Sequence, residues 1–285
     1  MKLLLKYLDH KNNFLILGMD KKNAAKMGSV KEELLTLTKN AYVEYTENDI
    51  NWGGYSQIST TLHMLEKSQQ YPCDYIHFIT GADVPLMNAE MFDIFFENNR
   101  GFQFIEYAKD NYEFAKYKCN YFHLFVENKA YRNSLSLKML NHGFVRLQKL
   151  LSIERKHSRL YHGSAYFSIT NELAKYIISK QEYIKKNFRF TLGADEVWLQ
   201  TIVADSAYLN NVYKFEMDGA NLRYIDWKRR VGSSPYTFVS EDYDDLKRIM
   251  NTKYIFARKF DENRDMDIIS KIYSDLNKTK VKKSL

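Results

Sequence analysis

Short apolar runs alternate with amphipathic segments through the first half of the chain, and this alternation constrains the fold more than any other feature. The apolar runs have the length and composition of buried strands, and the segments between them repeat their apolar residues at helical spacing. This order is typical of a mainly parallel sheet with helices on both faces. The predicted strands are 14–19, 41–45, 75–80 and 102–107, and the predicted helices are 55–67 and 91–96.

The second half of the chain is less regular but belongs to the same α/β class. A strand is predicted at 164–169, and helices are predicted at 134–151, 171–179, 196–204, 241–250 and 266–276. Asn88 and Ser240 are residue types that cap the helices following them. Because no Gly/Ser-rich linker interrupts the chain, we expect one domain over residues 1–276 and a basic tail over 277–285.

The bulk properties exclude several classes of protein. The two cysteines, Cys73 and Cys119, exclude a disulfide framework, lack metal-ligand spacing and indicate a cytoplasmic setting. No apolar run approaches the ~20 residues of a spanning helix. The net charge of +7 fits phosphorylated substrates or an anionic lipid surface, and the tail allows peripheral contact with the inner face of a membrane. No basic stripe or known module predicts nucleic-acid binding.

Two aspartates directly follow predicted strands. Asp20 ends the first strand, and Asp83 follows the third within the segment Thr80-Gly81-Ala82-Asp83. Ligands of open α/β sheets bind beyond the carboxyl ends of the strands, so both carboxylates are candidates for contacting substrate. Each could equally cap the next helix, and spacing alone does not separate the two roles.

The segment around Asp83 occupies the place where many nucleotide-sugar transferases carry an Asp-x-Asp metal motif, but Gly81 replaces the first acid. If no metal bridges a diphosphate there, Lys and Arg side chains must do so. Two basic clusters qualify: Lys228-Arg229-Arg230, and Arg258-Lys259 between Phe256 and Phe260. An ordinary basic pair is a solvated surface, but flanking aromatic rings favour a binding role.

The pair Asp195-Glu196 stands at the predicted start of a helix. A carboxylate held near apolar neighbours there can act as a general base. Capping of the helix and interaction with its dipole fit Asp195 well, and the role of base fits Glu196 better, but the sequence alone does not separate the two roles. The seven histidines form neither a metal motif nor a triad and are interpreted as structural or surface groups.

The order of these motifs resembles the core-2/I-branching β-1,6-N-acetylglucosaminyltransferase family, which includes the peptide O-xylosyltransferases. In its small size and few cysteines, the chain is most similar to the bacterial members of this family. The matching blocks are 20–22, 52–56, 75–86, 163–168, 195–201, 222–227, 234–238 and 256–261. The resemblance implies a GT-A-like nucleotide-sugar fold, an inverting reaction without metal or other cofactor, UDP-N-acetylglucosamine or UDP-xylose as donor, and a glycan hydroxyl as acceptor.

The resemblance also implies residue roles. Glu196 matches the catalytic base, Lys259 matches the lysine that holds the diphosphate, and Asp20 matches an acid that contacts the nucleotide. The second diphosphate cation has no ungapped match; Arg230 or Arg229 replaces it if a small gap is allowed.

Two further residues match the acceptor side of the family's site. Glu106 resembles an acceptor-binding glutamate, and Trp227 matches an aromatic residue near the sugar. The family also has an apolar first strand, ending in Ala-His, that has no counterpart in this chain. A catalytically inactive descendant that binds a sugar or a protein is therefore the alternative function.

Overall fold

The computed structural model describes residues 2–24, 32–34, 36–39, 42–109, 112–157, 159–214 and 217–278. Its strands are β1 (Phe14–Asp20), β2 (Tyr42–Asn48), β3 (Tyr75–His77), β4 (Asp83–Pro85), β5 (Phe104–Tyr107), β6 (Gly163–Thr170), β7 (Arg223–Ile225) and β8 (Phe256–Arg258). Its α-helices are α1 (Lys2–Tyr7), α2 (Lys21–Ala24), α4 (Tyr55–Ser68), α5 (Ala89–Asn98), α6 (Tyr112–Cys119), α7 (Leu135–Leu150), α8 (Asn171–Ser179), α9 (Gln181–Phe188), α10 (Trp198–Ala204), α11 (Tyr243–Ile249) and α12 (Met266–Lys278). Short 3₁₀ turns are η2 (Ala194–Glu196), η3 (Ala207–Asn211) and η4 (Ser240–Asp242).

The described strands form three small sheets, ordered β1-β2, β3-β6-β5 and β4-β8-β7. The pairs β1/β2 and β7/β8 are parallel, whereas β3/β6, β5/β6 and β4/β8 are antiparallel. The prediction of a mainly parallel sheet is therefore wrong, although the mixed α/β class is confirmed. The reason is visible at Tyr107, which pairs with Gly163: the chain leaves the sheet after β5 and re-enters at the same edge as β6.

Local capping explains several helix starts. The side chain of Asn88 accepts a hydrogen bond from the N–H of Met91, as predicted, and Ser134 accepts one from Leu137 at the start of α7. The predicted cap at Ser240 is wrong. Ser240 is the first residue of η4, and the side chain of Asp242 instead accepts from the N–H of Val239.

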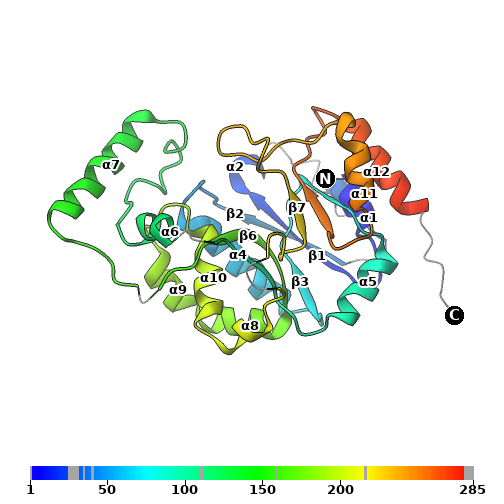
Figure 1. The fold of residues 1–285 in the computed structure, drawn as a ribbon, viewed down its shortest axis with the longest axis horizontal. Helices are drawn as coiled ribbons and strands as arrows, with labels where there is room; N and C mark the ends of the chain where they lie inside the picture. Colours follow the sequence, from blue (N-terminus) through cyan, green and yellow to red (C-terminus); the bar gives the residue numbers. More distant parts are fainter. Residues whose placement is uncertain are drawn as a thin grey trace.

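Apolar faces of the helices cover the sheets. In Figure 1, α8, α9 and α10 lie along the lower side of the sheets, and α11 and α12 lie at the upper right near α1. Phe167 of β6 packs in one core with Ile177 of α8 and Trp198 of α10. Ala257 of β8 packs in a second core with Ile272 of α12.

One buried arginine joins two of the sheets. Arg223, the first residue of β7, donates to the carbonyl oxygen of Phe167 at 2.7 Å, to that of Phe78 at 3.2 Å and to Ser168 Oγ at 2.8 Å. These acceptors lie on β6 or directly after β3. The guanidinium therefore fixes the sheet that carries β8 against the sheet that carries β6.

A cavity of about 940 Å³ separates β1 from β3. Leu15 and Ile16 line it on one side, and Tyr75 and Ile76 line it on the other. Among the described residues β1 pairs only with β2, and β3 only with β6, so each strand has one open edge facing this groove. The predicted absence of one family strand stays a prediction, as does the domain boundary; of the basic tail, residues 279–285 lie outside the described residues.

Candidate active site

Glu196 and Asp195 lie in the short 3₁₀ turn η2, directly before α10. The turn is entered through Gly193, whose φ of 60° lies in the left-handed region that favours glycine. The N–H of Gly193 donates to the carbonyl oxygen of Gly53 at 2.6 Å. The Trp52-Gly53-Gly54 turn therefore fixes the backbone that presents the two carboxylates.

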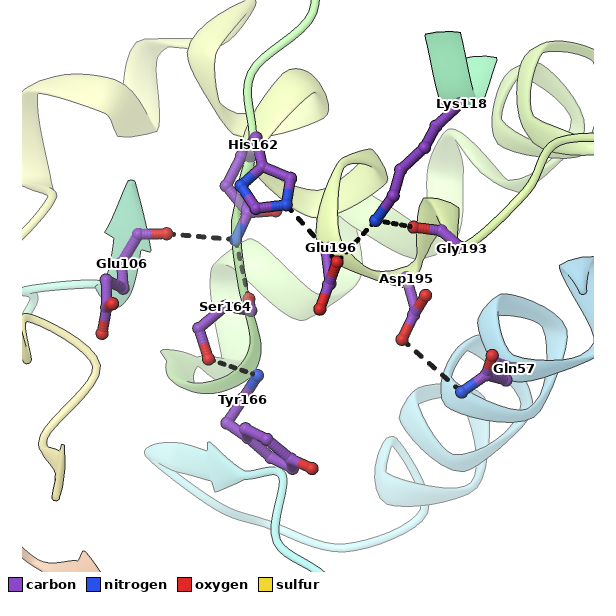
Figure 2. Close-up of polar contacts among 10 residues, drawn as sticks. Gln57, Glu106, Lys118, His162, Ser164, Tyr166, Gly193, Asp195 and Glu196 are labelled. Carbon is purple, nitrogen blue, oxygen red and sulfur yellow. Dashed lines mark hydrogen bonds and ion pairs between the residues drawn. The ribbon is translucent and has the colours of Figure 1, made fainter. Parts of the chain in front are cut away.

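Two cationic or proton-donating groups converge on one oxygen of Glu196. Lys118 Nζ lies 2.6 Å from Glu196 Oε2, and His162 Nε2 lies 3.4 Å from the same oxygen. Burial raises the pKa of Glu196, but the hydrogen bond from His162 and the charge of Lys118 outweigh burial and lower the pKa to about 2. Figure 2 shows His162 and Lys118 reaching Glu196 from left and right. Glu196 is therefore ionised at neutral pH.

Asp195 has the opposite electrostatics. Burial raises the pKa of Asp195 to about 6, and the neighbouring charge of Glu196 adds to this effect. Gln57 Nε2 of α4 donates to its Oδ2 at 3.5 Å. Two adjacent carboxylates thus differ in acidity, an arrangement that in enzymes separates the group that stays ionised from the group that exchanges a proton near neutrality.

Gln200 ties the helix behind Glu196 to the sheet. Its side-chain Nε2 donates to the backbone carbonyl oxygens of Ser164 at 2.7 Å and Glu106 at 3.2 Å, and its backbone carbonyl oxygen accepts from Tyr107 Oη at 3.0 Å. Gly163 makes this approach feasible, because a Cβ there would lie 1.8 Å from the carbonyl oxygen of Glu106. The position of Glu196 relative to β5 and β6 is therefore closely determined.

Glu106 lies on β5, and its backbone carbonyl oxygen accepts a hydrogen bond from Gln200, four residues after Glu196. Glu106 and Glu196 are both labelled in Figure 2. Burial raises its pKa, as does the charge of Asp218, while a backbone hydrogen bond from Gly219 and the charge of Arg223 lower it. The structure thus brings the predicted base and the predicted acceptor-binding glutamate to one edge of the sheet.

The predicted basic pair Arg258-Lys259 lies near this edge, where Tyr166 contacts its arginine. The Arg258 guanidinium lies 4.7 Å from the centre of the Tyr166 ring, and it pairs with Asp83 at 3.1 Å. Burial raises the pKa of Tyr166 to about 12, and the charges that act on it include Arg258 and Asp83 as well as Asp195 and Glu196. Tyr166 therefore lies within electrostatic reach of both the acidic turn and the cationic cluster.

Both oxygens of the Asp83 carboxylate have protein partners. Oδ1 accepts from Arg258, and Oδ2 accepts from the N–H of Thr80 at 2.5 Å. Asp20 similarly accepts from the N–H of Lys22 at 3.1 Å, at the start of α2. Asp20 therefore makes the contact expected of a helix cap, whereas Asp83 is the first residue of β4 and the next helix, α5, is capped by Asn88. The donor-binding roles of both residues stay predictions.

The family model described as Branch, Core-2/I-Branching enzyme, matches residues 1–250. The chain belongs to the Core-2/I-branching enzyme family. Members of this family are glycosyltransferases, which move a sugar from a nucleotide-sugar donor to a glycan acceptor. A search of curated proteins found no match.

The match to the Core-2/I-branching family ends before Lys259, whose proposed role depends on its local motif. Lys259 directly follows β8, partly exposed, and no side-chain partner is present for it within the described ranges. Because β7 and β8 are parallel, the residues after Ile225 lie at the same edge as Lys259. A cation at this edge is available to an incoming anion.

In the other predicted cluster, Lys228-Arg229-Arg230, one cation is paired with protein carboxylates of the described ranges and the rest are not. Arg229 pairs with Asp226 and Asp242, each at 2.6 Å, and lies 3.8 Å from the centre of the Tyr236 ring. The exposed side chains of Lys228 and Arg230 have no partner in the described part of the chain, so the predicted Arg230 stays one of two candidate cations here. Trp227 is 48% exposed beside it, a position that permits contact with a sugar but does not test it.

Sequence reasoning missed several residues of the site. His162, interpreted as structural or surface, contacts Glu196; Lys118 lies on α6, a helix that was not predicted. Neither residue stands in a motif, because each reaches the site through tertiary packing. No cluster of three or more His, Cys, Asp or Glu side chains that could hold a metal occurs in the described residues, and the absence of a metal requirement stays a prediction.

Proposed function

We propose that this chain is an inverting, metal-independent glycosyltransferase that moves N-acetylglucosamine, or xylose, from a UDP-sugar to a hydroxyl group of a glycan. The observation that carries the proposal is the ionised, fixed and partly exposed carboxylate of Glu196 at the sheet edge of a Core-2/I-branching family member. Donor identity and inversion are supported by the motifs of the family rather than by geometry.

Glu196 acts as the general base. Its Oε2 is held by Lys118 and His162, while its Oε1 has no hydrogen-bond partner among the described residues. The acceptor O–H donates to Oε1, and its oxygen attacks the anomeric carbon as the proton passes to the carboxylate. The bond from that carbon to the diphosphate breaks, and UDP leaves with the electron pair.

The Lys118–Glu196 pair has two opposing effects on this step. It keeps the carboxylate ionised and oriented, but a pKa of about 2 makes Glu196 a weak base while the pair is intact. We expect an acceptor hydroxyl to accept a hydrogen bond from Lys118 when it binds. Sharing the lysine raises the proton affinity of Glu196 at the moment of transfer.

The leaving diphosphate is stabilised by side-chain cations. Lys259 follows β8 at the same edge as the β7 terminus, and Arg230 is the second candidate. Arg258, directly before Lys259, is held in place by its ion pair with Asp83. Fixed cations in a partly dry site stabilise developing negative charge without the reorganisation that water requires.

The test is Glu196→Gln, which keeps the shape of the side chain and removes the base. Transfer from UDP-N-acetylglucosamine or UDP-xylose should fall by about a hundredfold or more, while UDP affinity measured by calorimetry stays close to wild type. Asp195→Asn serves as the matched carboxylate control and should retain more activity. Equal transfer by wild type and Glu196→Gln contradicts the proposed base.

The same titration addresses the alternative function. An inactive descendant that binds a sugar or protein would give no calorimetric signal with UDP and no transfer by the wild-type chain. Wild-type binding of UDP together with turnover removes that alternative.

A further inference from the structure

Helix α7 has an inverted polarity. Its side facing the protein carries Asn141 and Gln148, which are 0% and 3% exposed, together with Val145. Its outward side carries Met139 at 65% and Leu150 at 83% exposed. Surface helices of soluble proteins normally place apolar residues inward and polar residues outward. Something other than water is therefore expected to cover the outer face.

The inward polar contacts show that the helix is specifically seated. Asn141 Nδ2 donates to His123 Nδ1 at 2.9 Å. Gln148 donates to the carbonyl oxygen of Phe122 at 2.9 Å and accepts from its N–H at 2.8 Å. A helix held by buried side-chain hydrogen bonds is not free to rotate its leucines inward. These hydrogen bonds therefore fix the helix with its apolar face outward.

The exposed apolar residues form one continuous stripe. It consists of Met139, Leu140, Leu147, Leu150 and Leu151, all at least half exposed. Their separations of seven, eleven and four residues place them on one side of a helix. Figure 1 shows α7 at one end of the molecule, apart from the sheets and far from α12. An apolar stripe on an outlying helix marks an interaction surface.

The charge of the segment indicates what covers the stripe. Residues 128–153 contain five Lys and Arg and no Asp or Glu, in a chain of net charge +7. On the helix itself the cations are Lys138, Arg146 and Lys149, which lie to one side of the stripe. A second copy of the chain would bring like charges together, whereas an anionic surface would attract them.

We propose that α7 is an interfacial helix that docks the protein on an anionic lipid bilayer, with the apolar stripe buried at the headgroup boundary. A long amphipathic helix with apolar residues on one face and cations beside them is the form that lies in such an interface. The basic tail predicted to touch a membrane follows α12 in the sequence, so the stripe on α7 is a separate contact surface.

Docking through α7 also orients the candidate site. Lys149 lies 5.6 Å from the centre of the Tyr117 ring, and His142 Nε2 lies 3.4 Å from Tyr117 Oη. Tyr117 precedes Lys118 on α6, and Lys118 pairs with Glu196. The docked helix thus holds the acidic turn at a fixed position relative to the bilayer, but the lipid binding is tested without any assumption about transfer.

The experiment is co-sedimentation of the full chain with vesicles of phosphatidylcholine, alone or with about 30% phosphatidylglycerol. The wild-type chain should bind the anionic vesicles and bind less as salt rises. The variant Leu140→Gln/Leu147→Gln/Leu150→Gln should lose about tenfold or more in vesicle affinity. Because these side chains are exposed, its melting temperature should stay close to wild type.

Matched variants separate the explanations. Ile94→Gln/Met217→Gln/Met266→Gln removes three exposed apolar side chains elsewhere and should bind like wild type. Lys138→Gln/Arg146→Gln should weaken binding to anionic vesicles, whereas Lys185→Gln/Lys186→Gln on α9 should not.

Three results overturn the proposal. The first is wild-type protein that ignores anionic vesicles, which leaves an apolar protein partner as the occupant. The second is binding that survives the triple leucine variant but disappears in a chain ending at Lys278. The third is a wild-type dimer in solution that the leucine variant converts to a monomer without any vesicle binding.

Discussion

Replacing Arg223 with methionine tests how the two halves of the candidate site are held together. Its guanidinium donates to the carbonyl oxygens of Phe78, Phe167 and Asn221 and to Ser168 Oγ. Burial lowers the pKa of Arg223 to about 10 although the charge of Asp83 raises it, so the net penalty on the buried charge is about 3 kcal/mol. Four charge-assisted hydrogen bonds, at about 1.5 kcal/mol each, more than offset this cost.

Arg223→Met removes those bonds and relieves the burial of charge, so the free energy of unfolding should fall by about 3 kcal/mol. The assay is urea denaturation at neutral pH, with Arg100→Met as control. Among the described residues the ion pairs of Arg100 are surface pairs with Glu97 and Asp74, and its replacement should leave stability close to wild type. Equal stability of the two variants would refute a joining role for Arg223.

Three further outcomes are expected. Gly163→Ala should destabilise the protein by about 2 kcal/mol and lower transfer, because the new Cβ would meet the carbonyl oxygen of Glu106 at 1.8 Å; denaturation and activity assays check this, and a neutral effect contradicts the packing. Burial raises the pKa of Asp195 from 3.8 to about 6. Between these pH values the folded state holds a proton that the unfolded chain has released. The stability that this bound proton contributes is therefore lost as the pH rises through about 6. Asp195→Asn should remove that loss, as measured by urea denaturation at pH values on both sides of the window. UDP affinity of the wild-type chain should be unchanged in excess EDTA, and a fall would indicate a bound metal.

Local sequence signals predicted much of the fold. The helix predicted at 171–179 is α8, and the capping residue Asn88 marked the start of α5. Strand direction was not predictable from the same signals, because the antiparallel course of β6 depends on how the long segment after Tyr107 returns to the sheet. Apolar periodicity shows that a strand exists and does not show from which end it enters.

The candidate site was predictable only in part. The acidic pair stood out because Asp195 and Glu196 are adjacent, but Lys118 lies on a helix with weak apolar periodicity, and His162 stands in no motif. The periodicity of α7 predicted a helix without showing which face points inward. Buried partners such as His123 decide that orientation, and they come from another part of the chain.

The most direct test of the account is calorimetric titration of UDP into the wild-type chain, Lys259→Ala and Lys253→Ala. Lys253 precedes β8 and Lys259 follows it, so the two replacements remove equal charge at opposite ends of one strand. If side-chain cations at the sheet edge hold the diphosphate, Lys259→Ala should weaken UDP binding by about tenfold or more and Lys253→Ala should not. Unchanged affinity in Lys259→Ala would contradict the central claim.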